Sequence, residues 1–274
     1  MNATFIVNDY LLIWNLLFQT SISESIYKLK QKTWNAYQTE YNLLFQDKSN
    51  ILKDYKNYIP TDDTIYNLIL ENASYERIKR QANKYRLEVM SIWDKNKKEI
   101  DYLYKKILRM RCDPYTFFVV NPQFNIVDQP YQNSLIIGRE IDSKNLFSIL
   151  YDINYEIVFH NIKNYSEEFI NFKKAILELA IYNELATRLT GRSFYQSGSP
   201  SLSSLKRFLY PYWLMYLGVP QEEFFQYMMR DKIVFEVEKY AYEKELKKMS
   251  IEEFIDFCIR NKRYIVREKK EEII

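Results

Sequence analysis

Residues 115–140 read YTFFVVNPQFNIVDQPYQNSLIIGRE, and this stretch decides the fold class. Short runs of apolar, aromatic or β-branched residues are separated here by Pro, Asn, Gln and Gly, a pattern typical of strands and turns. The sequence therefore predicts two or three strands across 115–138. Because no other part of the chain has a comparable β-signal, we expect one small sheet in an otherwise helical protein.

The segments on either side of this stretch show helical periodicity. Residues 1–112 hold Pro60 as their one strong break, and Asp62 and Asp63 follow it as N-cap candidates. We expect three to five helices there, with the apolar N-terminus as a buried first helix. Ser166 is the expected N-cap of one later helix, and Gly191 ends it. Beyond residue 140, helices are expected at 142–150, 153–164, 167–189, 202–217, 220–247 and 250–262.

This order of elements predicts an α+β fold that is predominantly α. We expect a helical N-terminal domain over residues 1–112. Residues 113–274 would then form a core that holds the sheet at 115–138 and the helices at 153–164 and 167–189, followed by a C-terminal helical extension.

Composition excludes several classes of function. The net charge is +3, from 39 basic and 36 acidic residues, which gives no reason to expect nucleic acid as a partner. Cys112 and Cys258 suit a reducing cytosol better than a disulfide framework. The N-terminus lacks a basic signal-peptide region, and its apolar run is too short to cross a bilayer. We therefore expect a cytoplasmic protein without a membrane partner, and the wealth of Tyr, Asn, Lys and Ile suggests a bacterial source.

One short stretch has the spacing of a helical zinc motif. Residues 160–164 read HNIKN, which matches H-E-x-x-H in length but has Asn161 in place of the Glu and Asn164 in place of the second His. In the full motif two histidines one helical turn apart hold the metal, and the Glu takes a proton from the bound water. His160 is the chain's single histidine.

A second stretch extends the match. Glu184 lies twenty residues after Asn164, within NELAT at 183–187. Together these stretches resemble the thermolysin-like zinc peptidases called gluzincins, whose third ligand is a Glu at this distance within N-E-x-x-[ST]-D. Arg188 stands where the group has Asp. The resemblance covers about residues 115–190 and implies a zincin-like core. It also implies an exposed edge strand that binds peptide by strand addition, for which SLIIGRE, with Ile136, Ile137 and Gly138, is the candidate.

The chemistry of such a site is largely lost. His160 and Glu184 remain as vestigial metal ligands, whereas Asn164 is a poor zinc ligand and Asn161 cannot act as a base. We expect no catalytic residue and no cofactor, with weak zinc binding left open. Arg188 is placed to pair with Glu184, and Tyr210 is a further candidate for the cleft. The simpler interpretation of His160 is a half-buried histidine with a hydrogen-bond partner.

Three hypotheses follow. The first is a catalytically impaired metallopeptidase-like protein, a pseudopeptidase, that binds a peptide or protein, with a role in bacterial peptide maturation. The second is an active zinc peptidase in which Glu156, Glu178 or Asp152 joins His160 and Glu184. The third is a helical scaffold or interaction protein. In addition, the amphipathic C-terminal helix at 220–247 is a candidate surface for homo-oligomers.

Overall fold

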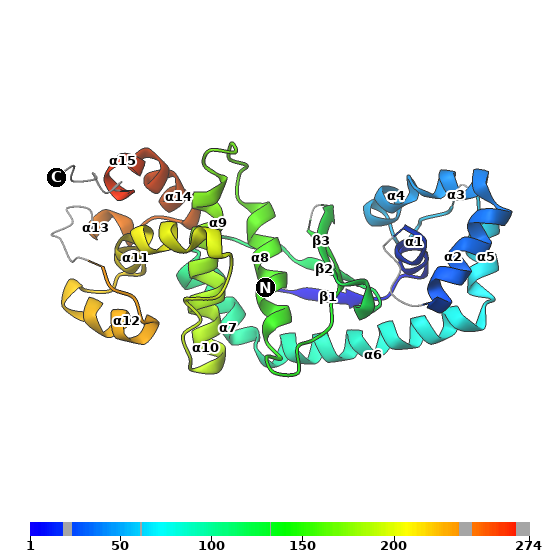
Figure 1. The fold of residues 1–274 in the computed structure, drawn as a ribbon, viewed down its shortest axis with the longest axis horizontal. Helices are drawn as coiled ribbons and strands as arrows, with labels where there is room; N and C mark the ends of the chain where they lie inside the picture. Colours follow the sequence, from blue (N-terminus) through cyan, green and yellow to red (C-terminus); the bar gives the residue numbers. More distant parts are fainter. Residues whose placement is uncertain (19–23, 61, 132, 236–242, 267–274) are drawn as a thin grey trace, which may run out of the picture. The chain divides into compact units, whose positions relative to one another are not determined.

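A computed structural model describes residues 1–18, 24–60, 62–131, 133–235 and 243–266 (Figure 1). The chain divides into two compact units. Unit 1 comprises residues 1–95 and 113–157, and unit 2 comprises residues 96–112 and 158–274. The division therefore departs from the predicted boundary at residue 112, because helices of the N-terminal segment and the strands share one hydrophobic core.

Unit 1 holds a four-stranded mixed sheet with the strand order β1-β2-β4-β3. Strands β1, β2 and β4 run parallel to one another, and β3 pairs antiparallel with β4. The strands are β1 (Ala3–Ile6), β2 (Tyr115–Val119), β3 (Ile126–Tyr131) and β4 (Ser134–Gly138). The two or three strands predicted across 115–138 are thus confirmed, and their number is three. Strand β1 was not predicted, because its four residues are too few to show an alternation of their own.

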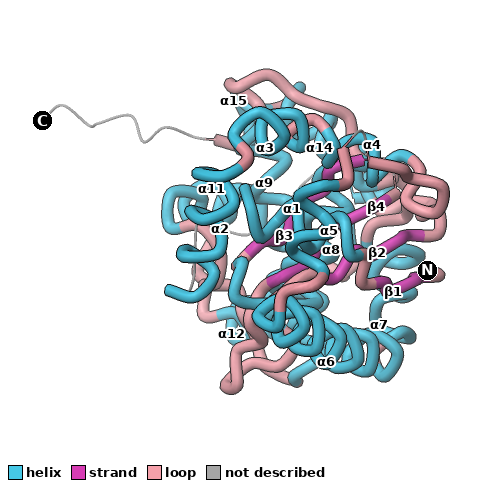
Figure 2. The backbone as a smooth tube through the Cα atoms, turned by 90° about the vertical axis from the view of Figure 1, so that its right-hand side faces the viewer, coloured by secondary structure: helices cyan, strands magenta, loops and turns pink. Residues whose placement is uncertain are grey.

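The burial of β2 and β4 explains their composition. Every residue of β4 is buried, as are four of the five residues of β2. Parallel strands covered on both faces have continuous apolar sequences rather than alternating ones. The runs FFV and LII meet this requirement, and the two strands lie side by side in the sheet (Figure 2).

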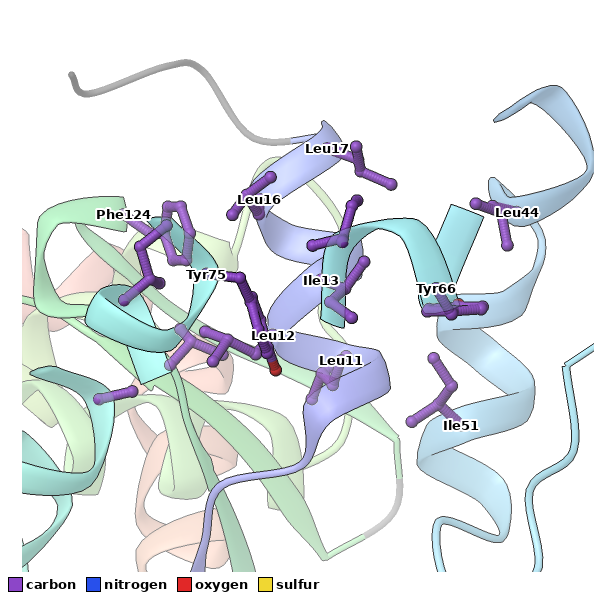
Figure 3. Close-up of a cluster of buried hydrophobic side chains, with 14 of the residues drawn as sticks. Leu11, Leu12, Ile13, Leu16, Leu17, Leu44, Ile51, Tyr66, Tyr75 and Phe124 are labelled. Atoms are coloured by element: carbon purple, nitrogen blue, oxygen red, sulfur yellow. The ribbon is translucent and has the colours of Figure 1, made fainter. Parts of the chain in front are cut away.

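Helices of unit 1 pack their apolar faces around one core (Figure 3). Leu12 and Leu16 of α1 face this core, together with Tyr75 of α6, and Phe118 and Ile136 join it from the sheet. The helices that lie wholly in this unit are α1 (Asp9–Phe18), α2 (Glu24–Ala36), α3 (Gln38–Leu44), α4 (Asp47–Lys53), α5 (Thr64–Leu70) and α6 (Ala73–Lys95). Of the two N-cap candidates, Asp63 takes the N-cap position of α5 without a side-chain cap bond, and the side chain of Asp62 accepts a hydrogen bond from the N–H of Thr64 (2.8 Å).

In its described residues, the regular secondary structure of unit 2 consists of helices joined by loops. Its first segments are α7 (Lys97–Tyr102) and the π-helix η1 (Leu103–Ile107). One continuous helix then comprises α9 (Ile170–Glu178), the π-helix η3 (Leu179–Leu185) and α10 (Ala186–Thr190). The remaining helices are α11 (Ser203–Leu217), α12 (Phe224–Asp231), α13 (Glu243–Leu246), α14 (Ile251–Arg260) and α15 (Lys262–Ile265). Helix α8 (Ser148–Asn161) runs from unit 1 into unit 2.

Of the six helices predicted beyond residue 140, those at 202–217 and 250–262 match α11 and α14, and the other four differ. The pieces expected at 142–150 and 153–164 form the single helix α8, which ends at Asn161. Ser166 does not cap the next helix, which begins at Ile170 after a turn. The helix expected over 220–247 stops at Asp231, because Lys232 adopts a left-handed conformation (φ 53°), and residues 236–242 lie outside the described part.

The predicted fold class is confirmed as α+β with helix predominant. Among the described residues, none of the helices combines the length and apolar composition that a membrane crossing requires.

Candidate functional site

The HNIKN stretch does not lie on one helical face. His160 and Asn161 are the last two residues of α8, and Asn164 lies in the loop that follows. The side chains of His160 and Asn164 are both exposed. Because Asn164 lies outside the helix, it does not take the position one turn after His160 that the zinc motif requires.

Lys173 of α9 explains why α8 ends where it does. Its ammonium donates hydrogen bonds to the backbone carbonyls of Ile162 (3.0 Å) and Lys163 (3.1 Å). The same group lies 4.3 Å from the centre of the Phe159 ring. Burial lowers the pKa of Lys173 to about 8. A cation on the free carbonyls after a helix stabilises the helix end, so the chain leaves the helix before Asn164.

Glu184 belongs to a buried cluster of polar and charged side chains. Its Oε1 accepts a hydrogen bond from the guanidinium of Arg230 (2.9 Å). The same guanidinium binds both carboxylate oxygens of Asp231, at 2.6 and 2.8 Å. Asp231 also accepts hydrogen bonds from the Tyr210 hydroxyl and from the Asn183 amide (2.9 Å). We call these five residues the Glu184 network.

The network holds two carboxylates against one guanidinium in a buried place. Glu184 and Asp231 are 8% and 2% exposed. Burial raises the pKa of Glu184, opposed by the neighbouring charge of Arg230. Burial would also raise the pKa of Asp231, but hydrogen bonds from Arg230 and Tyr210 lower it overall. Burial next to Asp231 raises the pKa of Tyr210, so its hydroxyl remains a donor. Arg230 is thus the cation on which both carboxylates depend.

The local backbone around Glu184 is also unusual. Asn183 and Glu184 lie in η3, a π-helical segment between the α-helical α9 and α10. A π-helical turn is rare and occurs often at functional sites, because it rotates the side chains of the following turn away from regular α-helical positions. The first three residues of the NELAT stretch therefore have a backbone that departs from a regular α-helix.

The expected ion pair between Glu184 and Arg188 is wrong. Arg188 donates to the carboxylate of Glu99 (2.7 Å), and its guanidinium lies 3.6 Å from the centre of the Tyr102 ring. Arg188 is exposed, whereas Glu184 points into the interior, where Arg230 neutralises it. The spacing of four residues implied a regular α-helix, and η3 departs from one just before Arg188.

The prediction that SLIIGRE forms an edge strand is also wrong. Strand β4 lies between β2 and β3, so its backbone has no open edge for strand addition, and Ile136, Ile137 and Gly138 are all buried. A Cβ atom on Gly138 would overlap with the side chain of Val120, so the strand is closely packed as well as paired.

The antiparallel edge strand of the sheet is β3. Its sequence includes Asp128 and Pro130, and its pairing with β4 is irregular between Asp128 and Tyr131. Charge, proline and bulges are devices that protect an edge strand from pairing with another chain. Strand β3 is therefore poorly suited to pair with an added peptide strand.

The donor groups for a metal are dispersed. In the described parts of the chain, no three His, Cys, Asp or Glu side chains lie close enough together to hold an ion. Two of the alternative ligands have other partners: Asp152 pairs with Arg139 (2.7 Å) and Glu178 with Lys206 (2.9 Å). The residues present therefore do not fit the zinc site that the gluzincin resemblance implies.

Of the predicted site residues, the structure brings Glu184 and Tyr210 together, both in contact with the Arg230–Asp231 pair. His160, Asn164 and Arg188 take no part in this network. Arg230 and Asp231 were not predicted as site residues, because no motif spacing links them to Glu184. A weak signal was present, since two adjacent opposite charges end a short helix, FFQYMMRD. Comparisons with protein-family models, with curated proteins and with solved structures found no match for this chain.

Proposed function

We propose that the protein is a metallopeptidase-like pseudopeptidase that binds a peptide or protein without cleaving it. The observation that carries this proposal is the bond between Arg230 and Glu184. Glu184, which the gluzincin resemblance assigns as a metal ligand, is bound to a guanidinium, and this guanidinium supplies the positive charge that a metal would supply in an active relative. Asn161 adds to this support, since it replaces the residue that would act as the base.

Metal content and hydrolysis test the proposal directly. We expect purified protein incubated with zinc and then desalted to retain far less than one zinc ion per chain by mass spectrometry. We also expect no cleavage of a mixed peptide library, from which the intact protein nevertheless retains a subset of peptides. The alternative of an active zinc peptidase predicts stoichiometric zinc that is lost in the Glu184→Ala variant. Retention of no peptide at all would contradict the binding function.

The second part of the proposal is that the protein forms a homo-oligomer. An exposed apolar surface on α12 supports it. Phe225 and Met229 lie one turn apart on α12 and are 68% and 65% exposed. Large apolar side chains on one exposed helical face are typical of an interaction surface. We propose that two copies meet through this face of α12.

The Phe225→Glu/Met229→Glu variant tests this contact. We expect the wild-type chain to have the mass of a dimer in light scattering after size exclusion, and the variant to have the mass of a monomer. The buried charge would repel its counterpart across a symmetric interface. Gln226→Glu, an exposed change on the same helix, serves as the control. A monomeric wild type would refute the contact.

A further inference from the structure

Unit 1 contains a polar depression at the carboxyl end of two parallel strands. Its volume is about 330 Å³. One side is formed by α6 and the other by the segments that follow β2 and β4. Residues Gln81, Lys84, Tyr85, Glu88, Asn121 and Glu140 carry its polar groups. In sheets with parallel strands, ligands bind preferentially outside the carboxyl ends of those strands.

The floor of this depression is held in place by hydrogen bonds. Asn121 is 1% exposed, accepts from the N–H of Gln123 (3.0 Å) and donates to the side-chain carbonyl of Gln81 (2.9 Å). Gln81 is thereby oriented with its amide N–H groups available as donors. The Tyr85 hydroxyl accepts from the backbone N–H of Arg139 (3.3 Å) and keeps its own proton for donation. These amide and hydroxyl groups suit the carbonyl groups of a ligand.

The rim carries charge of both signs with an acidic excess. Glu88 and Glu140 supply two carboxylates, and Lys84 supplies one ammonium. Lys84 and Glu88 are 4.0 Å apart and their side chains are largely exposed, so they neutralise each other only weakly. A ligand that matches this rim carries a positive charge, with hydrogen-bonding carbonyl groups beside it.

We propose that this depression binds the amino end of a peptide. The ammonium of the first residue pairs with Glu88 and Glu140, and the adjacent peptide carbonyls accept from Gln81 and Tyr85. A free amino end is the one part of a peptide that joins a primary ammonium to a carbonyl two bonds beyond it. This inference rests on the proposed peptide binding and specifies which end of the peptide is recognised.

Titration of ¹⁵N-labelled full-length protein with triglycine tests the site. The side-chain amide signals of Gln81, Asn121 and Gln123 report on the depression directly. We expect these signals to shift, and we expect N-acetyltriglycine to bind about tenfold more weakly or worse, since acetylation removes the charged hydrogen bonds. Glycine amide, which has the ammonium but no second peptide unit, is expected to bind more weakly than triglycine.

Two variants localise the contact. Glu88→Gln/Glu140→Gln should weaken triglycine binding by about tenfold or more, because both changes remove charge without changing shape. Glu76→Gln, an exposed change on α6 outside the depression, should leave it unchanged. Equal binding of the acetylated peptide, equal binding of glycine amide or an unaffected double variant would each overturn the proposal. If triglycine binds without shifting the three amides, this site is rejected while the proposed function stands. If no peptide of the library binds, the function itself is rejected.

Discussion

Replacement of Arg230 by Met is expected to lower the free energy of unfolding by about 3 kcal/mol at pH 7, as estimated for breaking a buried ion pair. The change removes the one cation that binds both Glu184 and Asp231. Met keeps most of the length and apolar volume of the side chain, so the lost charge dominates the effect. The variant would leave two carboxylates in a place where they are almost inaccessible to water. Urea denaturation followed by circular dichroism measures the difference.

Arg188→Met is the matched control for this experiment. Arg188 also bonds to a carboxylate, that of Glu99, but the two side chains are 37% and 33% exposed. Pairs of this kind contribute about 0–1 kcal/mol, because water screens the charges. Equal losses in the two variants would show that burial of the Glu184 network has no energetic consequence. That result would remove the physical basis for treating Arg230 as the cation of the site.

The free energy of unfolding of the Arg230→Met variant should also depend on pH in a definite direction. In the Arg230→Met variant the guanidinium no longer opposes the effect of burial, so the pKa of Glu184 rises further above its value in the unfolded chain, and the pKa of Asp231 rises from its lowered value. The folded variant then binds more protons than the unfolded one, and its stability falls as pH rises through this window. The difference from wild type should therefore be largest at neutral pH and shrink on acidification. Adding Glu184→Gln and Asp231→Asn should recover part of the loss at pH 7, because these changes remove the unpaired charges.

The fold could be predicted where the signal was local. The strand segments in 115–138 and the helix stop at Gly191, which has φ 71°, follow from residue type and from the properties of neighbouring residues. Strand β1 could not be predicted in this way, since its pairing partner β2 begins far along the chain at Tyr115. The order of the strands likewise decides that β4 is an inner strand, and no run of apolar residues specifies that order.

The candidate site was predictable only in part, because its residues come from segments that are far apart in the sequence. Sequence spacing singled out Glu184, and the structure places it among buried charges. Its partner Arg230 lies 46 positions away and was beyond any spacing rule. The end of α8 depends on the Lys173 ammonium, which comes eleven positions after the carbonyl of Ile162 that it binds. Contacts between separate helices therefore determine both what Glu184 binds and why Asn164 leaves the helix.

The second large effect is expected at Lys206, which fixes the loop after α10. Its ammonium pairs with Glu178 of α9 (2.9 Å), and the two side chains are 3% and 6% exposed. It also donates to the backbone carbonyls of Tyr195 (3.2 Å) and Ser197 (2.7 Å). Glu178 in turn accepts from the N–H of Ser199 (2.9 Å). Lys206→Met would break all three bonds of the ammonium and leave Glu178 charged and buried, at a cost of about 3–5 kcal/mol.

Hydrogen exchange in the loop after α10 tests whether Lys206 holds that loop in place. The loop approaches Glu178 so closely that a Cβ on Gly198 would overlap with the carboxylate, and it carries Tyr195, whose ring packs 5.1 Å from that of Tyr210 in the Glu184 network. In Lys206→Met we expect faster hydrogen exchange at the amide of Ser199 as well as lower stability. Lys163→Met breaks an exposed pair with Asp256 and should cost about 1 kcal/mol or less without affecting that amide. Adding Glu178→Gln to Lys206→Met should restore part of the stability, since the orphaned charge is removed. If Ser199 remained protected in Lys206→Met, the loop would be held by its own turns, and the ion pair would have no role in shaping the surroundings of Tyr210.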